Sequence, residues 1–97
     1  MRLLALLAFT SSALAAVTQV GYAGEVYSEH EYHGQVYRVH SNKCSELAHK
    51  VHSIKVKDNG ICTLFFDREC HHPIKRYVND DPRIDPPASD ARSVKCS

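Results

Sequence analysis

The stretch Tyr27–Gly34, with the sequence YSEHEYHG, carries the strongest structural signal in this chain of 97 residues. Two aromatic residues, Tyr27 and Tyr32, precede Gly34, and glycine readily takes the positive φ that a tight turn requires. Strand-favouring residues surround the stretch over positions 25–40, and the alternating run Ser53–Lys57 follows later. The sequence therefore predicts a tight hairpin, a long connection and a further strand.

A similar arrangement recurs in the second half of the chain, after the turn signal Asp58–Gly60. Phe65 and Ser93 follow the first aromatic residue and the serine of the first half by 38 and 40 positions. Cys70 and His72 stand where the first half has its second aromatic residue and its glycine. Four strands in each half predict an all-β fold, in which two Greek-key motifs form a β-sandwich of eight short strands.

At these residues the chain resembles the βγ-crystallin Greek-key domain, whose motif is aromatic-x4-aromatic-x-Gly with a serine well downstream. The matching residues are Tyr27, Tyr32, Gly34, Ser53, Phe65 and Ser93. The resemblance implies that Tyr32 packs beneath the hairpin turn and that Ser53 hydrogen-bonds back to the hairpin. It covers residues 24–97, with a first repeat over about 24–57 and a more degenerate second repeat over about 60–97.

The N-terminus has the pattern of a secretory signal peptide. Basic Arg2 precedes an apolar run that ends at Phe9, and Ala13-Leu14-Ala15 supplies small residues for cleavage. The alternative is an apolar helix packed on the domain, and the run is too short for a membrane anchor. We predict a signal peptide over residues 1–15, a single domain over 16–97 and a secreted protein similar to the small βγ-crystallin-like proteins of fungi.

All four cysteines lie in the predicted mature segment: Cys44, Cys62, Cys70 and Cys96. An even cysteine count in a short secreted chain predicts two disulfides, which would offset a small core. A zinc–thiolate site is the less favoured alternative, because the chain has no C-x-x-C pair. The resemblance places all four cysteines near the second repeat, as replacements for its lost motif residues. Of the three possible pairings we predict Cys44–Cys96 with Cys62–Cys70.

Many microbial βγ-crystallin domains bind calcium through an Asn/Asp-Asn/Asp-x-x-Ser/Thr-Ser segment. The matching segments here, 48–53 and 88–93, lack the paired Asn or Asp and contain Lys50 and Arg92 respectively. Ca²⁺ requires several oxygen ligands and gains from carboxylates. We therefore predict no calcium site of the family type, and we interpret the acidic segment 79–85 as a solvated loop.

The balance of charge is close to neutral, with 12 Lys and Arg against 11 Asp and Glu, and it argues against electrostatic binding of nucleic acid. Seven histidines include three close pairs: His30 and His33, His49 and His52, and His71 and His72. A pair is a weak metal signal, since zinc takes three or four protein ligands, and we interpret these side chains as solvated. A second hypothesis is that their protonation in an acidic medium raises affinity for anionic surfaces.

Catalysis is not indicated by the sequence. The serines lie in no G-x-S-x-G elbow, and oxidised cysteines cannot act as nucleophiles. The carboxylates of the two hairpins belong to a domain too small for a deep substrate cleft: Glu29, Glu31, Asp67 and Glu69. We predict no enzymatic activity, no cofactor, no bound metal, no membrane anchor and a monomer.

Two function classes remain. The first is an extracellular interaction factor, effector-like or antimicrobial, whose partner is an unknown extracellular protein or cell-surface component. The second is a structural extracellular or cell-wall-associated domain without a dedicated target.

Overall fold

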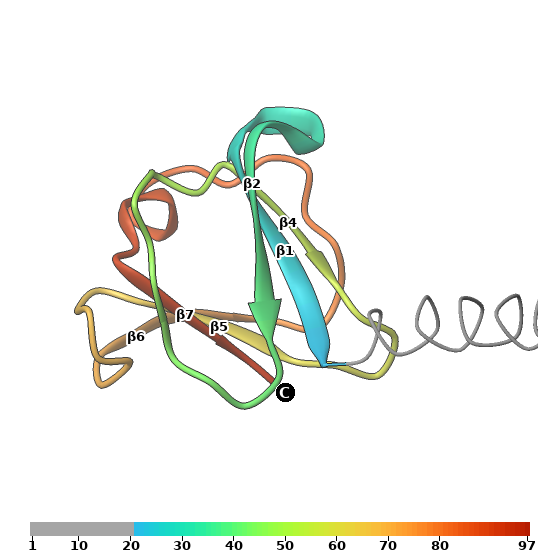
Figure 1. The fold of residues 1–97 in the computed structure, drawn as a ribbon. Coiled ribbons are helices and arrows are strands. Elements are labelled where there is room, and N and C mark those ends of the chain that lie inside the picture. The colour runs from blue at the N-terminus through green and yellow to red at the C-terminus, as the bar shows by residue number, and fades with distance from the viewer. Residues whose placement is uncertain (1–20) are drawn as a thin grey trace, which may run out of the picture.

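Residues 21–97 of this computed structural model form seven β-strands and two short 3-10 helices (Figure 1). The strands are β1 (Tyr22–Glu29), β2 (His33–His40), β3 (Ser45–Glu46), β4 (Ser53–Val56), β5 (Cys62–Phe65), β6 (Pro73–Tyr77) and β7 (Ser93–Cys96). The helices are η1 (His30–Tyr32) and η2 (Ala88–Asp90). The predicted signal peptide lies outside the described residues. Within residues 21–97, no helix has the length and apolar character to cross a membrane.

Two antiparallel sheets face each other, with strand orders β2-β1-β4 and β3-β7-β5-β6 (Figure 1). Each half of the chain contributes one segment to the other half's sheet. Strand β3 of the first half pairs with β7, where Ser45 lies opposite Val94. In return, Asp81 of the second half pairs with Ile54 on β4. This exchange joins two Greek keys into one sandwich and confirms the predicted all-β fold.

The structure corrects the expected number of strands. In place of an eighth strand, the segment 79–85 contributes an isolated bridge between Asp81 and Ile54, with N–H···O distances of 3.0 and 2.9 Å. Pro82 follows at once and has no N–H with which to extend the pairing. The Asp80 carboxylate accepts a hydrogen bond of 2.7 Å from the Val56 N–H. Part of the segment interpreted as a solvated loop is therefore bonded to the edge of a sheet.

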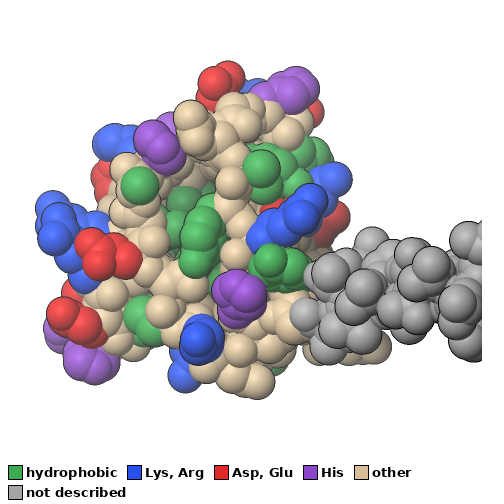
Figure 2. All heavy atoms as spheres, in the orientation of Figure 1, with side chains coloured by type: hydrophobic (Ala, Val, Ile, Leu, Met, Phe, Trp, Pro, Cys, Tyr) green, Lys and Arg blue, Asp and Glu red, His purple; other side chains and the backbone are tan. Residues whose placement is uncertain are grey.

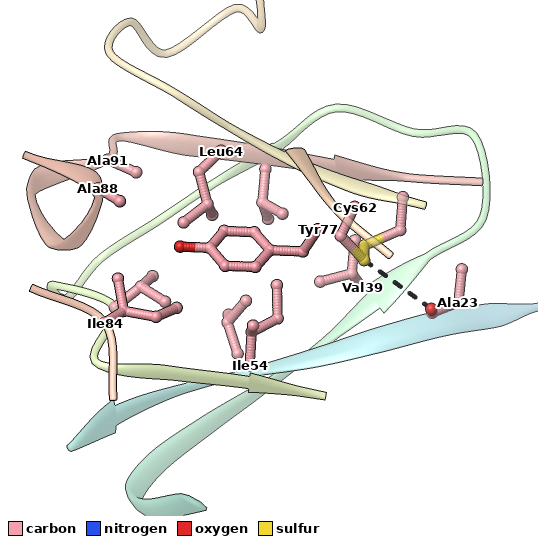
Figure 3. Close-up of a cluster of buried hydrophobic side chains, with 13 residues drawn as sticks. Ala23, Val39, Ile54, Cys62, Leu64, Tyr77, Ile84, Ala88 and Ala91 are labelled. Atoms are coloured by element: carbon pink, nitrogen blue, oxygen red, sulfur yellow. Dashed lines mark hydrogen bonds between the residues drawn. A yellow bond between two sulfur atoms is a disulfide. The ribbon is translucent and has the colours of Figure 1, made fainter. Parts of the chain in front are cut away.

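The core fills the space between the two sheets (Figure 3). The Tyr77 ring lies near its centre, between Leu64 of one sheet and Ile54 of the other. Leu64 and Ile54 are completely buried, and each such side chain contributes roughly 1.5–3 kcal/mol to stability. In β4, buried Ile54 alternates with exposed Lys55, as the sequence pattern predicts.

Two disulfides are present, but the pairing predicted from the sequence is wrong. The bonds are Cys44–Cys70 and Cys62–Cys96. Cys62 and Cys96 lie directly opposite each other on β5 and β7, and both are completely buried. Because Ser45 lies opposite Val94, the register places Cys44 level with exposed Lys95 rather than with Cys96. Side chains alternate between faces along a strand, so Cys44 is on the wrong face to reach Cys96.

The buried disulfide packs directly on the backbone of β1. A Cβ atom added to Gly24 would lie 2.8 Å from the Cys62 Sγ and 2.9 Å from the Lys55 carbonyl oxygen. Glycine is therefore required at this position so that the two sheets can approach each other.

Candidate functional site

The first hairpin, between β1 and β2, is folded over on itself. The rings of Tyr27 and Tyr32 meet edge to face, with centroids 5.6 Å apart. Gly34 has φ +85°, and a Cβ at this position would overlap the Ser28 hydroxyl. The Ser53 hydroxyl donates a hydrogen bond of 2.6 Å to the Glu29 carbonyl and accepts one of 3.0 Å from the Tyr32 N–H. One serine on β4 thus fixes both sides of the turn.

The second hairpin, between β5 and β6, keeps the serine but differs in its turn. The Ser93 hydroxyl donates to the Asp67 carbonyl at 2.5 Å and accepts from the Cys70 N–H at 3.2 Å. Cys70 occupies the position that Tyr32 has in the first hairpin, and its disulfide with Cys44 replaces the aromatic contact. His72 occupies the glycine position without a positive φ. A covalent link and a different turn therefore stand in for the motif residues that this repeat lacks.

The Asp67 carboxylate organises this second turn. It accepts hydrogen bonds from the backbone N–H groups of His72 at 2.8 Å, His71 at 2.9 Å and Glu69 at 3.1 Å. Burial disfavours the ionised carboxylate, but these N–H donors outweigh that effect and lower the pKa of Asp67. The first hairpin uses a neutral group instead, because the Ser28 hydroxyl accepts the Gln35 N–H at 2.8 Å.

The two segments that match the family's calcium motif are tied to each other by an ion pair. The Lys50 ammonium lies 2.6 Å from an Asp90 carboxylate oxygen. The Val51 N–H also donates to the Ser89 carbonyl at 3.1 Å. The motif serines, Ser53 and Ser93, direct their hydroxyls at hairpin carbonyls. The Asp90 carboxylate, the Ser89 carbonyl and the two serine hydroxyls are therefore all engaged in contacts within the domain. The absence of a calcium site stays a prediction.

Two of the histidine pairs are linked by a contact between their members. His30 of the first pair meets His52 of the second, with ring centroids 5.2 Å apart. The His52 Nδ1 lies 2.7 Å from the Ser28 carbonyl oxygen, and the His30 Nε2 lies 3.5 Å from an Asp85 carboxylate oxygen. His71 and His72 lie in the second hairpin, next to Asp67. The spacing of the histidines in the sequence does not predict the contacts of His30 and His52.

A groove lies on the open side of the sandwich, between the outermost strands of the two sheets. Its walls are formed by residues 26–28 of β1, residues 35–37 of β2 and the segment 46–51, and its volume is about 270 Å³. Val26 and Val51 on its floor are buried, whereas Val36 and Tyr37 are 52% and 42% exposed. Figure 2 shows apolar side chains at the bottom of a hollow in this face. The groove can therefore accept an apolar group from solvent.

Tyr27 is held at one side of this groove by a charged neighbour. Its hydroxyl donates a hydrogen bond of 2.5 Å to Glu25, which also pairs with Arg38 at 3.2 Å. Burial, this bond and the negative charge of Glu25 raise the pKa of Tyr27 to about 12. Tyr27 therefore presents a neutral, fixed ring to the groove at physiological pH.

Sequence reasoning did not identify the groove. The available signal is the adjacent pair Val36 and Tyr37, which puts an apolar side chain on each face of β2. A strand with one solvated face would alternate instead. The contribution of segment 46–51 depends on the chain crossing to the other sheet at β3, which spacing does not specify.

The exchanged segments and the two serine-to-hairpin bonds together define a double Greek-key sandwich. No family model and no curated protein matches the chain. A βγ-crystallin domain from Clostridium beijerinckii superposes with a TM-score of 0.66 at 19% identity, over 76% of this chain and 95% of that chain. The N-terminal domain of Protein S gives 0.66 at 12% identity, over 77% and 94%. A βγ-crystallin domain from Flavobacterium johnsoniae gives 0.68 at 13% identity, over 77% and 93%. The chain has the βγ-crystallin fold.

Proposed function

We propose that this chain is a secreted, non-enzymatic interaction protein, effector-like or antimicrobial, that binds an extended segment of a target protein in the groove beside β2. The observation that carries the proposal is the exposed pair Val36 and Tyr37 on an edge strand that lines this groove.

An edge strand of this kind invites pairing. Proteins usually protect sheet edges with short strands, charged residues, proline or bulges. Strand β2 is eight residues long, has β1 as its only strand neighbour among residues 21–97, and exposes two large apolar side chains at its middle. Edge strands with neighbouring side-chain pockets bind extended peptides by adding them as a further strand. These features support β2 as a binding edge rather than a solvated one.

The dimensions of the groove favour an extended segment over a folded surface. The segment 46–51 forms the opposite wall, so a target that enters the groove lies between this segment and β2. A volume of about 270 Å³ accommodates an apolar side chain of such a segment rather than a whole small molecule, for which sites are larger. Backbone bonds to β2 would supply affinity, and the apolar floor would select the inserted side chain.

Two features support an extracellular, non-enzymatic role. Both cysteine pairs are joined as disulfides, which persist in oxidising compartments, in agreement with the predicted signal peptide. The hydroxyls of the two motif serines, Ser53 and Ser93, donate to backbone carbonyls and so are not available as nucleophiles. The fold itself is compatible with a binding role.

The test applies the purified, disulfide-bonded protein to competing microbes and to plant tissue. Growth inhibition or damage by the native chain is expected, together with its loss in Val36→Asp and Tyr37→Asp. Val78→Asp is the matched control, since Val78 is 55% exposed and lies outside the groove. Mass spectrometry of the secreted chain, with an expected N-terminus at residue 16, tests secretion separately.

Two results would contradict the proposal. If the native protein has no effect on any organism tested, the alternative of a structural extracellular domain is favoured. If the effect persists in both groove variants, the groove is not the binding site.

A further inference from the structure

We propose that Asp67, Glu69 and His71 on the second hairpin form a surface site for a divalent transition-metal ion such as Zn²⁺. One ligand atom from each of the three side chains lies within 4.8 Å of the other two. The His71 Nδ1 is 3.8 Å from an Asp67 carboxylate oxygen. The residues alternate along five positions of one turn, so a single short segment supplies all three ligands. This inference is independent of the groove and of the function proposed for it.

The spacing of the ligand atoms is close to that of an occupied site. Zinc binds carboxylate oxygen and imidazole nitrogen at about 2.0–2.2 Å, which puts tetrahedral ligands roughly 3.4 Å apart. The side chains must therefore close by about 1 Å or less for each ligand. Glu69 and His71 are both exposed and can make this adjustment, whereas Asp67 is partly buried and stays fixed.

Asp67 is oriented as a metal-binding carboxylate usually is. Metal-ligating carboxylates are commonly held by hydrogen bonds from an outer shell of protein groups. Here the backbone N–H groups of Glu69, His71 and His72 supply those bonds. The same bonds fix the backbone of both other proposed ligands relative to the Asp67 side chain.

The turn that carries the three ligands is anchored at Cys70, which lies between Glu69 and His71. Its disulfide to Cys44 and the bond from its N–H to the Ser93 hydroxyl attach the turn to the rest of the domain. The neighbouring cation, Arg68, pairs with Glu46 at 3.6 Å. The disulfide and the Arg68–Glu46 ion pair therefore hold the turn without using the proposed ligand atoms.

The first hairpin provides an internal comparison. It has the same ligand types at the same spacing, as Glu29, Glu31 and His33, yet among residues 21–97 only the second hairpin brings three such ligand atoms together. Glu31 has φ +59° and its carboxylate lies 3.9 Å from the Arg83 guanidinium, away from a shared point. The difference between the two turns, rather than their composition, creates the candidate site.

The donor set selects the kind of ion. One imidazole with two carboxylates suits zinc and neighbouring transition metals, whereas Ca²⁺ prefers six to eight oxygen ligands. Three protein ligands leave at least one coordination position for water.

The experiment is isothermal titration of Zn²⁺ into the disulfide-intact, chelator-treated protein at pH 7.5, with Ca²⁺ as a second titrant. We expect one zinc ion to bind with a micromolar Kd and Ca²⁺ to bind at least 100-fold more weakly. His71→Ala and Glu69→Gln should each weaken zinc binding tenfold or more. Asp67 is left unchanged because its carboxylate holds the turn.

The matched controls are His33→Ala and Glu31→Gln in the first hairpin, which should bind zinc like the native chain. Thermal unfolding of each apo variant shows that the fold is retained. Zinc binding weaker than millimolar, or unchanged binding by His71→Ala, would overturn the proposal. So would an equal loss in His33→Ala, because that result would assign the ion to other histidines.

Discussion

The Ser53 hydroxyl donates a 2.6 Å hydrogen bond to the carbonyl of Glu29 while accepting the N–H of Tyr32, so one buried side chain closes the first hairpin. Ser53→Ala leaves both backbone groups without this partner, and a buried polar group that loses its partner costs about 1–3 kcal/mol. We expect Ser53→Ala to lower the free energy of unfolding by about 2 kcal/mol, measured by urea denaturation with the disulfides intact.

Ser28→Ala is the control for this substitution. The Ser28 hydroxyl accepts the Gln35 N–H at an exposed position, where water can replace it. Ser28→Ala should lower the free energy of unfolding by much less than Ser53→Ala does. Equal losses of unfolding free energy in the two variants would show that burial of the Ser53 hydrogen bonds adds no stability beyond that of an exposed bond.

The two hairpins should differ in their need for glycine. Gly34 has φ +85° and lies against the Ser28 hydroxyl, so Gly34→Ala introduces both backbone strain and a steric overlap. We expect a loss of about 2 kcal/mol or more in urea denaturation. His72→Ala at the equivalent position should change stability by about 0.5 kcal/mol or less, because His72 is exposed and has no positive φ. A larger loss in His72→Ala than in Gly34→Ala would refute this assignment of the turns.

The two disulfides should contribute unequally. Their sequence separations of 26 and 34 residues predict similar entropic contributions, about 3.5 and about 3.8 kcal/mol. Cys62 and Cys96, however, are also completely buried against the backbone of Gly24. Replacing this pair by serine should therefore cost at least about 1 kcal/mol more than replacing Cys44 and Cys70, because two hydroxyls would enter the core.

Thermal or urea unfolding of the two double variants measures this difference. Non-reducing peptide mapping of the native protein provides an independent check, and it should yield linked peptides that contain Cys62 with Cys96 and Cys44 with Cys70. Equal stability losses would mean that chain entropy alone explains both bonds.

The sequence motif predicts the first repeat well because its residues act locally. Tyr27, Tyr32 and Gly34 lie within one hairpin, and the structure gives that hairpin the contacts that the motif implies. Disulfide pairing could not be predicted in this way, since it depends on which face of β7 each cysteine meets. A one-residue difference in register exchanges the two faces, and spacing along the chain does not set that register.

The two candidate sites were missed for a related reason. The groove depends on β2 and the segment 46–51 lying at the same open side of the sandwich, although β2 and β3, from which the segment continues, belong to different sheets. The convergence of Asp67 with His71 depends on the backbone of one turn, and the same residue types diverge in the first hairpin. Composition identifies the candidates, whereas backbone conformation decides between them.

Buried Tyr77 and partly buried Tyr27 should make the protein less stable at alkaline pH. Burial and the charge of Asp81 raise the pKa of Tyr77 to about 12, and burial together with Glu25 raises that of Tyr27 to a similar value. An unfolded tyrosine ionises near pH 10. Between about pH 10 and 12 the folded chain thus binds more protons than the unfolded chain, and the free energy of unfolding must fall as pH rises.

Urea denaturation at intervals from pH 8.5 to 11.5 measures this dependence, with tyrosinate absorbance followed in parallel. The stabilisation from the two raised tyrosine pKa values should be complete below pH 10 and decline above it. Tyr77→Phe removes one of the two groups while keeping the ring in the core, so the slope against pH should decrease by about one proton. A slope that is the same in Tyr77→Phe and the native chain would show that Tyr77 ionises equally in the folded and unfolded states, contrary to its position between the two sheets.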